Sequence, residues 1–180
     1  SDVCSSDLGL LRADAREAFG MHDGRNRRPP RDRINALLSF LYSLWMNDCR
    51  SALEAAGLDP QVGFLHAVRP GRAALALDLM EEFRPVADRL ALTLINRQQL
   101  NPSDFKTGEG GAVGLEPDAR KAVLVAFQER KQETLRHPLL QTPLALGLVP
   151  LIQARLLARA IRGEADSDGM PARYLPFLTR

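Results

Sequence analysis

The sequence has 180 residues, with 24 Lys and Arg against 22 Asp and Glu, a formal net charge of +2, and 45% hydrophobic residues. This composition is typical of one globular domain and excludes a disordered chain. No stretch approaches the roughly 18 uninterrupted apolar residues of a membrane-spanning helix, and the N-terminus lacks the basic and apolar segments of a signal peptide. Only Cys4 and Cys49 are present, so neither a disulfide framework nor a structural zinc site is expected, and a reducing cytoplasm is the default location.

The first part of the chain is expected to precede the folded domain. Residues 1–8 show no apolar period and are predicted to be foreign to the natural protein or disordered. A short helix is predicted over residues 9–20, so that residues 9–23 form a remnant or linker. Residues 24–33, GRNRRPPRDR, hold five arginines and one aspartate, and their two successive prolines oppose helix formation.

The rest of the chain predicts helices. Apolar residues recur at three- and four-residue steps over residues 31–56, 73–97, 117–136 and 146–163. Asp32 is placed in the first turn of the first helix, and Pro85 is expected to break the second. The Gly-rich segment 105–116 suits a hairpin, and the C-terminal MPARYLPFLTR is expected to pack back on the core. Strands and helices do not alternate, so the predicted class is all-α, a multi-helix domain with at most one small β-hairpin.

One group of side chains could bind a metal. Asp78 lies three residues before Glu81 and four before Glu82, spacings that place carboxylates on one face of a helix. A divalent cation would remove their mutual repulsion, and His66 could fold back to add an imidazole. One imidazole with oxygen ligands suits manganese or magnesium better than zinc. The alternative is a solvated acidic helix face with an unrelated histidine.

Arginines form a second group, because only three of the 24 basic residues are lysines and the guanidinium suits phosphate. The basic segment holds Arg25, Arg27, Arg28, Arg31 and Arg33. Arg72 and Arg84 flank the acidic residues, and a further stripe comprises Arg155, Arg159 and Arg162. The alternative is that these arginines form solvated faces and salt bridges. His22 and His137 have no partners at useful spacing, and Cys49 is predicted to be a small core residue.

Several motifs occur in order: RRPP-x-x-x-x-NALLSFLY, GLDP-x-x-GFLH and ALDLMEEFRP, followed by GLEPDARKAVLVAFQERKQETLRHP and a terminal YLPFLTR. Together they resemble the CRISPR-associated spacer integrase family, the first and near-universal family of CRISPR-associated proteins, in the form that accompanies type I systems, perhaps subtype I-C. The match covers residues 24–180. The resemblance identifies this stretch with the family's α-helical C-terminal domain, which holds the active site, and implies that the family's N-terminal β-domain lies outside this sequence.

The resemblance implies a metal-dependent DNA endonuclease and integrase that uses Mg²⁺ or Mn²⁺. Such proteins insert fragments of foreign DNA as new spacers into the CRISPR array, which gives antiviral defence. The implied substrate is double-stranded DNA. The implied protein partners are a second copy of the chain, in a homodimer, and the small second CRISPR-associated protein.

The resemblance also assigns roles to residues. His66 and Glu81 would be catalytic metal ligands. Asp78 would be a supporting catalytic acid, either as a further ligand or as a partner of the ligands. The phosphate backbone would contact Arg25, Arg27, Arg28, Arg72 and Arg84. The family's first metal-binding glutamate lies in a G-x-E-G-x-x-A-x-x-Y-F segment well before the RRPP motif, a position at or before the first residue here. Glu17 is too close to that motif and lacks the flanking pattern, so it does not take this role.

Two other functions remain open. Because the first glutamate is missing, the chain could be a non-catalytic DNA-binding and dimerisation module, and weak or no nuclease activity is expected of this segment alone. A generic helical protein-interaction domain is the third possibility. It differs from the others because it predicts no salt-dependent binding of DNA.

Overall fold

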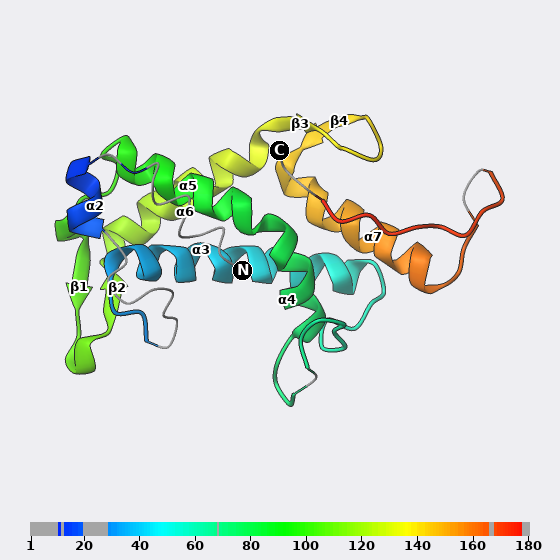
Figure 1. The fold of residues 1–180 in the computed structure, drawn as a ribbon, viewed down its shortest axis with the longest axis horizontal. Coiled ribbons are helices and arrows are strands. Elements are labelled where there is room, and N and C mark those ends of the chain that lie inside the picture. Colours follow the sequence, from blue (N-terminus) through cyan, green and yellow to red (C-terminus); the bar gives the residue numbers. More distant parts are fainter. Residues whose placement is uncertain (1–10, 12, 20–28, 68, 166–167, 178–180) are drawn as a thin grey trace. The chain divides into compact units, whose positions relative to one another are not determined.

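Helices make up most of the molecule, with two short antiparallel strand pairs (Figure 1). The structure is a computed structural model that describes residues 11, 13–19, 29–67, 69–165 and 168–177. The all-α prediction is therefore confirmed. Predictions for residues 1–8, His22, Arg25, Arg27 and Arg28 fall outside the described residues. Within the described ranges, no helix combines the length and apolar character needed to cross a membrane.

Most helices lie close to the residue ranges predicted from the sequence. The helices are α2 (Ala13–Phe19), α3 (Arg33–Ala55), α4 (Ala74–Met80), α5 (Arg84–Asn96), α6 (Pro117–Gln132) and α7 (Val149–Ile161). Single 3-10 turns are η2 (Glu81–Phe83), η3 (Pro102–Asp104), η4 (Glu109–Gly111) and η5 (Leu146–Leu148). The strands are β1 (Phe105–Thr107), β2 (Val113–Leu115), β3 (Thr134–Arg136) and β4 (Pro143–Ala145).

The described residues form two compact units. One contains the chain up to Ser43 together with Pro85–Glu129, and the other contains Leu44–Arg84 and the chain from Arg130 onward. Helix α3 contributes residues to both units.

The N-terminus of helix α3, in the first unit, is capped by the side chain of Asp32. The backbone N–H of Asn35 donates to Oδ1 of Asp32 at 2.7 Å, and the Asn35 side-chain amide donates to Oδ2 at the same distance. Asp32 therefore precedes the helix as its N-cap, where a carboxylate satisfies a free backbone donor, rather than lying in the first turn as predicted.

The first unit buries the apolar stripe of α3. Leu41 is fully buried, and the Tyr42 hydroxyl donates to the Asp88 carboxylate of α5. Phe19 of α2 meets Phe105 of β1 edge to face, with ring centroids 5.7 Å apart. Strands β1 and β2 pair in an antiparallel register, which confirms the predicted hairpin.

The second unit is organised around stacked rings. Phe83 stacks on Trp45 at 4.9 Å and on Phe177 at 5.6 Å, and both Phe83 and Trp45 are fully buried. In Figure 1 the C-terminal segment (red) runs along α7 (orange). Because Phe177 is only 2% exposed, the prediction that the aromatic tail packs back on the core is confirmed.

A second strand pair replaces the last turn of the predicted third long helix. Helix α6 ends at Gln132, and β3 pairs with β4 in an antiparallel register instead of continuing the helix to residue 136. The β-branched Thr134 loses side-chain freedom in a helix, and β4 supplies a backbone partner, with Thr134 opposite Ala145 and Arg136 opposite Pro143. The prediction of at most one small β-hairpin was therefore wrong, because the described residues contain two antiparallel strand pairs.

Cys49 is fully buried in α3, as predicted for a core residue. Burial, together with the nearby charges of Asp48 and Glu82, raises the pKa of its thiol well above the usual value. In a Cys4→Ser variant, where Cys49 is the only thiol, we expect alkylation at pH 8 to be at least about 100-fold slower in the folded protein than in urea, since reaction requires opening of the core. Rapid labelling without denaturant, measured by mass spectrometry, would contradict the buried position.

Candidate metal and DNA site

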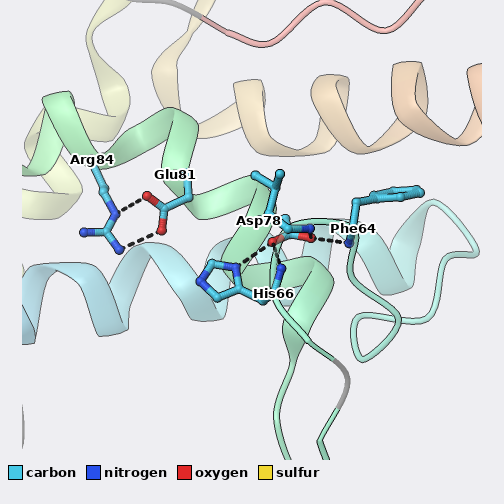
Figure 2. Close-up of polar contacts among 6 residues, drawn as sticks. Phe64, His66, Asp78, Glu81 and Arg84 are labelled. Atoms are coloured by element: carbon cyan, nitrogen blue, oxygen red, sulfur yellow. Dashed lines mark hydrogen bonds and ion pairs between the residues drawn. The ribbon is translucent and has the colours of Figure 1, made fainter. Parts of the chain in front are cut away.

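Asp78 of α4 holds the loop that carries His66 (Figure 2). Its Oδ2 accepts the backbone N–H of Phe64 at 2.5 Å and of Leu65 at 3.0 Å. Its Oδ1 accepts the backbone N–H of His66 at 3.0 Å and the ring Nδ1 of His66 at 2.6 Å. One carboxylate thus receives four hydrogen bonds from three consecutive residues, which fixes both the loop and the imidazole.

The loop approaches α4 so closely that Gly63 is required. A Cβ atom at this position would lie 2.8 Å from backbone and side-chain carbons of Ala74 and 2.8 Å from Oδ2 of Asp78. Any larger residue would push the loop away from the carboxylate. The glycine in the GFLH motif is therefore explained by the approach of Phe64, Leu65 and His66 to Asp78.

The electrostatics of the pair determine which atom His66 presents. Burial raises the pKa of Asp78, but the hydrogen bonds from the His66 ring and from the three backbone N–H groups outweigh it and hold this pKa below its usual value. An ionised carboxylate only accepts hydrogen bonds, so Nδ1 of His66 carries the proton that it donates. When the ring carries only this proton, Nε2 keeps its lone pair, as in metal-binding histidines oriented by a carboxylate.

Glu81 lies one turn beyond Asp78 but faces another partner. The guanidinium of Arg84 contacts the Glu81 carboxylate twice at 2.6 Å, once through Nη2 and once through Nε. Figure 2 shows Glu81 turned toward Arg84 and His66 turned toward Asp78. The described residues hold no group of three His, Cys, Asp or Glu side chains arranged to bind a metal. The roles of His66 and Glu81 as metal ligands therefore stay predictions. In this structure the charge of the Glu81 carboxylate is balanced by Arg84.

Glu82 does not share a face with the other two acids, so this part of the sequence analysis was wrong. Its carboxylate accepts Nε2 of Gln153 at 2.7 Å, the backbone N–H of Phe177 at 2.8 Å, and the Tyr174 hydroxyl. Burial raises the pKa of Glu82, and these hydrogen bonds oppose the rise. Burial and the Glu82 charge together raise the pKa of Tyr174, so its hydroxyl keeps its proton.

Sequence reasoning missed the partners of Glu82. Gln153 and His137 are 0% and 1% exposed, and Nε2 of His137 donates to Oε1 of Gln153 at 3.2 Å. A glutamine within the apolar run LVPLIQARLL was the available signal, because a buried amide needs polar partners. Nothing in the local pattern indicated that those partners would be Glu82 and Tyr174.

Comparison with known proteins decides the family. The family model described as "CRISPR associated protein Cas1" matches residues 10–129. A CRISPR-associated endonuclease Cas1 of Moorella thermoacetica is 58% identical over 166 residues, which cover 92% of this chain and 46% of the relative. Another, from Rhodospirillum rubrum, is 63% identical over 145 residues, 80% of this chain and 42% of the relative.

This chain belongs to the Cas1 family. A solved Cas1 protein from Thermotoga maritima superimposes with a TM-score of 0.79 and 29% identity, over 89% of this chain and 48% of that one. A partial Cas6-RT-Cas1–Cas2 complex contains a chain similar at a TM-score of 0.68 and 27% identity, over 87% of this chain and 47% of that one. The present chain thus spans about half the length of these Cas1 relatives.

Some arginines of this Cas1-family chain contact groups of their own unit, and others have side chains that are exposed or half-buried. Arg33 donates to the carbonyls of Ala18 at 2.8 Å and Pro102 at 3.3 Å, so it ties together parts of its own unit instead of extending the basic segment. Arg159 and Arg162 lie 3.3 Å and 3.8 Å from carboxylate oxygens of Glu164. These pairs favour the salt-bridge alternative for much of the stripe on α7.

Arg31, Arg72 and Arg155 remain accessible within the described residues. Arg31 and Arg155 are exposed and Arg72 is half-buried. Arg72 lies just before α4, the helix that carries Asp78. Of the arginines predicted to bind DNA, the structure therefore describes Arg72 and Arg84, and both lie near the candidate metal ligands in sequence.

We expect Asp78→Asn to loosen the His66 loop, because an amide nitrogen would face backbone donors that now meet a carboxylate. The loss of charge-assisted hydrogen bonds should cost about 1–3 kcal/mol of unfolding free energy and should speed hydrogen exchange in peptides covering residues 63–66. Urea denaturation and exchange mass spectrometry measure the two effects.

Asp59→Asn is the matched control for Asp78→Asn. Asp59 lies on the connection between α3 and α4, which also carries His66, and it accepts the backbone N–H of Gln61 at 2.9 Å, but it is exposed. Its replacement should change stability by less than about 0.5 kcal/mol. Equal behaviour of the two variants would show that Asp78 does not organise the loop.

Proposed function

We propose that this chain is the helical catalytic domain of a Cas1 spacer integrase, acting in CRISPR adaptation in the cytoplasm. In this proposal, residues 24–180 correspond to the family's α-helical C-terminal domain. The observation that supports it most directly is the His66–Asp78 pair, which leaves one imidazole nitrogen available on a loop held by α4, the helix that directly precedes Glu81. Membership of the Cas1 family and the relatives named as endonucleases support the assignment.

The residues present fit part of a divalent metal site. Nε2 of His66 and the Glu81 carboxylate are nitrogen and oxygen donors of the kinds that Mn²⁺ accepts, and the carboxylate also suits Mg²⁺. Asp78 would act on the ring rather than as a ligand, because its oxygens already accept four hydrogen bonds. The resemblance implies a further ligand from the family's first glutamate.

The proposed reaction is an in-line transesterification, in which the 3′-hydroxyl of a DNA fragment attacks a phosphodiester of the array. A new bond forms between that oxygen and the phosphorus, and the bond from the phosphorus to the 3′-oxygen of the array strand breaks, so that the array strand leaves with a free 3′-hydroxyl. A divalent cation bound at this site would supply Lewis-acid stabilisation of the charge that develops on the phosphate. Asp78 holds the imidazole proton on Nδ1, so that Nε2 is the ring atom left to bind a cation. Arg84 can exchange the Glu81 carboxylate for a phosphate oxygen, since a guanidinium forms paired hydrogen bonds with either group.

The proposed substrate is double-stranded DNA, with the protein acting as a homodimer together with Cas2. Arg72, Arg84 and the basic segment containing Arg25, Arg27 and Arg28 would contact the phosphate backbone. The similarity to a chain in a partial Cas6-RT-Cas1–Cas2 complex supports the choice of protein partner.

One observation favours a second function. Because the described residues lack a group of three metal-binding side chains, this chain by itself could bind DNA and dimerise without catalysing integration. The arginines would serve that role unchanged. The two functions differ in whether His66 contributes to the binding of a divalent cation.

Titration of the 180-residue chain with Mn²⁺ by calorimetry tests the metal site. We expect His66→Ala and Glu81→Gln each to weaken binding by at least about tenfold, since even loss of an outer-sphere group has that effect at metal sites. His22→Ala serves as the histidine control. Unchanged affinity in His66→Ala would refute the site and favour the non-catalytic module.

DNA binding is expected to depend strongly on salt. For a duplex titrated at two salt concentrations, a plot of the logarithm of the affinity against the logarithm of the salt concentration should have a slope of about −0.9 for each phosphate that the protein neutralises. Arg72→Gln should make this slope less negative by about 0.9, the value for one phosphate contact. Glu116→Gln, at a half-buried acidic residue of the other unit, is the control. Affinity that is absent or independent of salt would instead indicate a protein-interaction domain.

A further inference from the structure

The C-terminal strap, defined here as residues 172–177, is anchored to Glu82. Two of the three groups that donate to the Glu82 carboxylate belong to the strap, namely the Tyr174 hydroxyl and the backbone N–H of Phe177. The third is the side-chain amide of Gln153 in α7. A partly buried carboxylate needs such donors to offset its lost hydration, so the orientation of Glu82 depends on the docked strap.

The amide of Gln153 is itself fixed by polar contacts. Its Nε2 also donates to the carbonyl of Leu175 at 3.1 Å, which binds the strap a second time. Its Oε1 accepts Nε2 of His137. The backbone N–H of Leu140 donates to Nδ1 of His137 at 3.2 Å, so the ring proton lies on Nε2 and points at Gln153. The network is therefore directional and reaches from the β3–β4 connection through α7 to Glu82.

The strap also holds the residue after Glu82. The ring of Phe83 lies between those of Trp45 and Phe177, with centroid distances of 4.9 Å and 5.6 Å. Phe177 thus contacts the η2 turn twice, through its ring to Phe83 and through its backbone to Glu82. The second and third residues of this single turn are both held by the C-terminal strap.

The residues on either side of this held pair are the candidate site residues. Glu81 precedes Glu82, Arg84 follows Phe83, and the two form the ion pair described above. Since η2 contains only three residues, the directions in which the side chains of Glu81 and Arg84 leave the turn depend on where the backbone of residues 82 and 83 is held.

We propose that the C-terminal strap is a supporting part of the metal site. Docked on Glu82 and Phe83, it sets the direction of Glu81 and Arg84, and Glu82, Tyr174 and Phe177 are positioning residues. This inference rests on the proposed function, in which Glu81 is a metal ligand. It also requires reciprocity, so that a cation bound at Glu81 favours the docked strap by the same factor by which docking favours the cation.

The two tyrosines of the chain allow a matched test. Tyr174→Phe removes one hydroxyl that donates to a carboxylate next to the site, and Tyr42→Phe removes one that donates to Asp88 in the other unit. Both should lower the urea midpoint. Only Tyr174→Phe should weaken Mn²⁺ binding to the 180-residue chain, by about tenfold in calorimetry. Equal Mn²⁺ affinity in both variants and the parent overturns the proposal.

A measurement without metal separates this proposal from the proposed function. In the metal-free protein, Tyr174→Phe and Glu82→Gln should speed hydrogen exchange in peptides covering residues 79–84, whereas Tyr42→Phe should leave those peptides unchanged. Exchange unaffected by Tyr174→Phe overturns the positioning role. If the parent binds no Mn²⁺, or binds it equally after His66→Ala, the metal site is wrong, and the exchange result alone decides whether the strap holds the turn.

Discussion

Pro85 imposes a backbone constraint on which the candidate site depends. It has no N–H to donate to the carbonyl of Glu81, and its ring would collide with that carbonyl in a regular α-helix. The chain responds by tightening: α4 ends at Met80, and the N–H of Arg84 donates to Glu81 in the 3-10 turn η2. Each residue of a 3-10 helix advances by about 120° instead of about 100°, which makes the angle between the Asp78 and Glu82 side chains wider than in a continuous α-helix.

The result is that three nearby acids have three different partners. Asp78 gathers the backbone and ring donors of the His66 loop, and these lower its pKa. Glu81 meets Arg84, and Glu82 turns to Gln153 and the C-terminal strap. Separate partners remove the like-charge repulsion that a shared helix face would create. Each acid also has a different role: Asp78 orients the His66 imidazole, Glu81 is a candidate metal ligand, and Glu82 anchors the C-terminal strap.

Local patterns predicted much of the fold because they reflect local physics. The helical periodicity around Leu41, the breaking effect of Pro85 and the hairpin after Asp104 each depend on residues close in sequence. The patterns failed where a partner outside the periodic segment competed. Thr134 left the helix because β4 offered its backbone a partner, and Arg33, predicted as part of a basic segment, donates instead to carbonyls of two other segments of its unit.

The sequence by itself determined the helical class, the resemblance to the spacer integrases, and the choice of His66, Asp78 and Glu81 as candidate site residues. The tertiary structure decided what each acid does. Helical spacing specifies only which side chains start on one face, whereas a carboxylate settles where hydrogen-bond donors offset its desolvation. Those donors come from the GFLH loop, from Arg84, and from α7 with the C-terminal strap, and only the folded chain brings Gln153 and Tyr174 to Glu82.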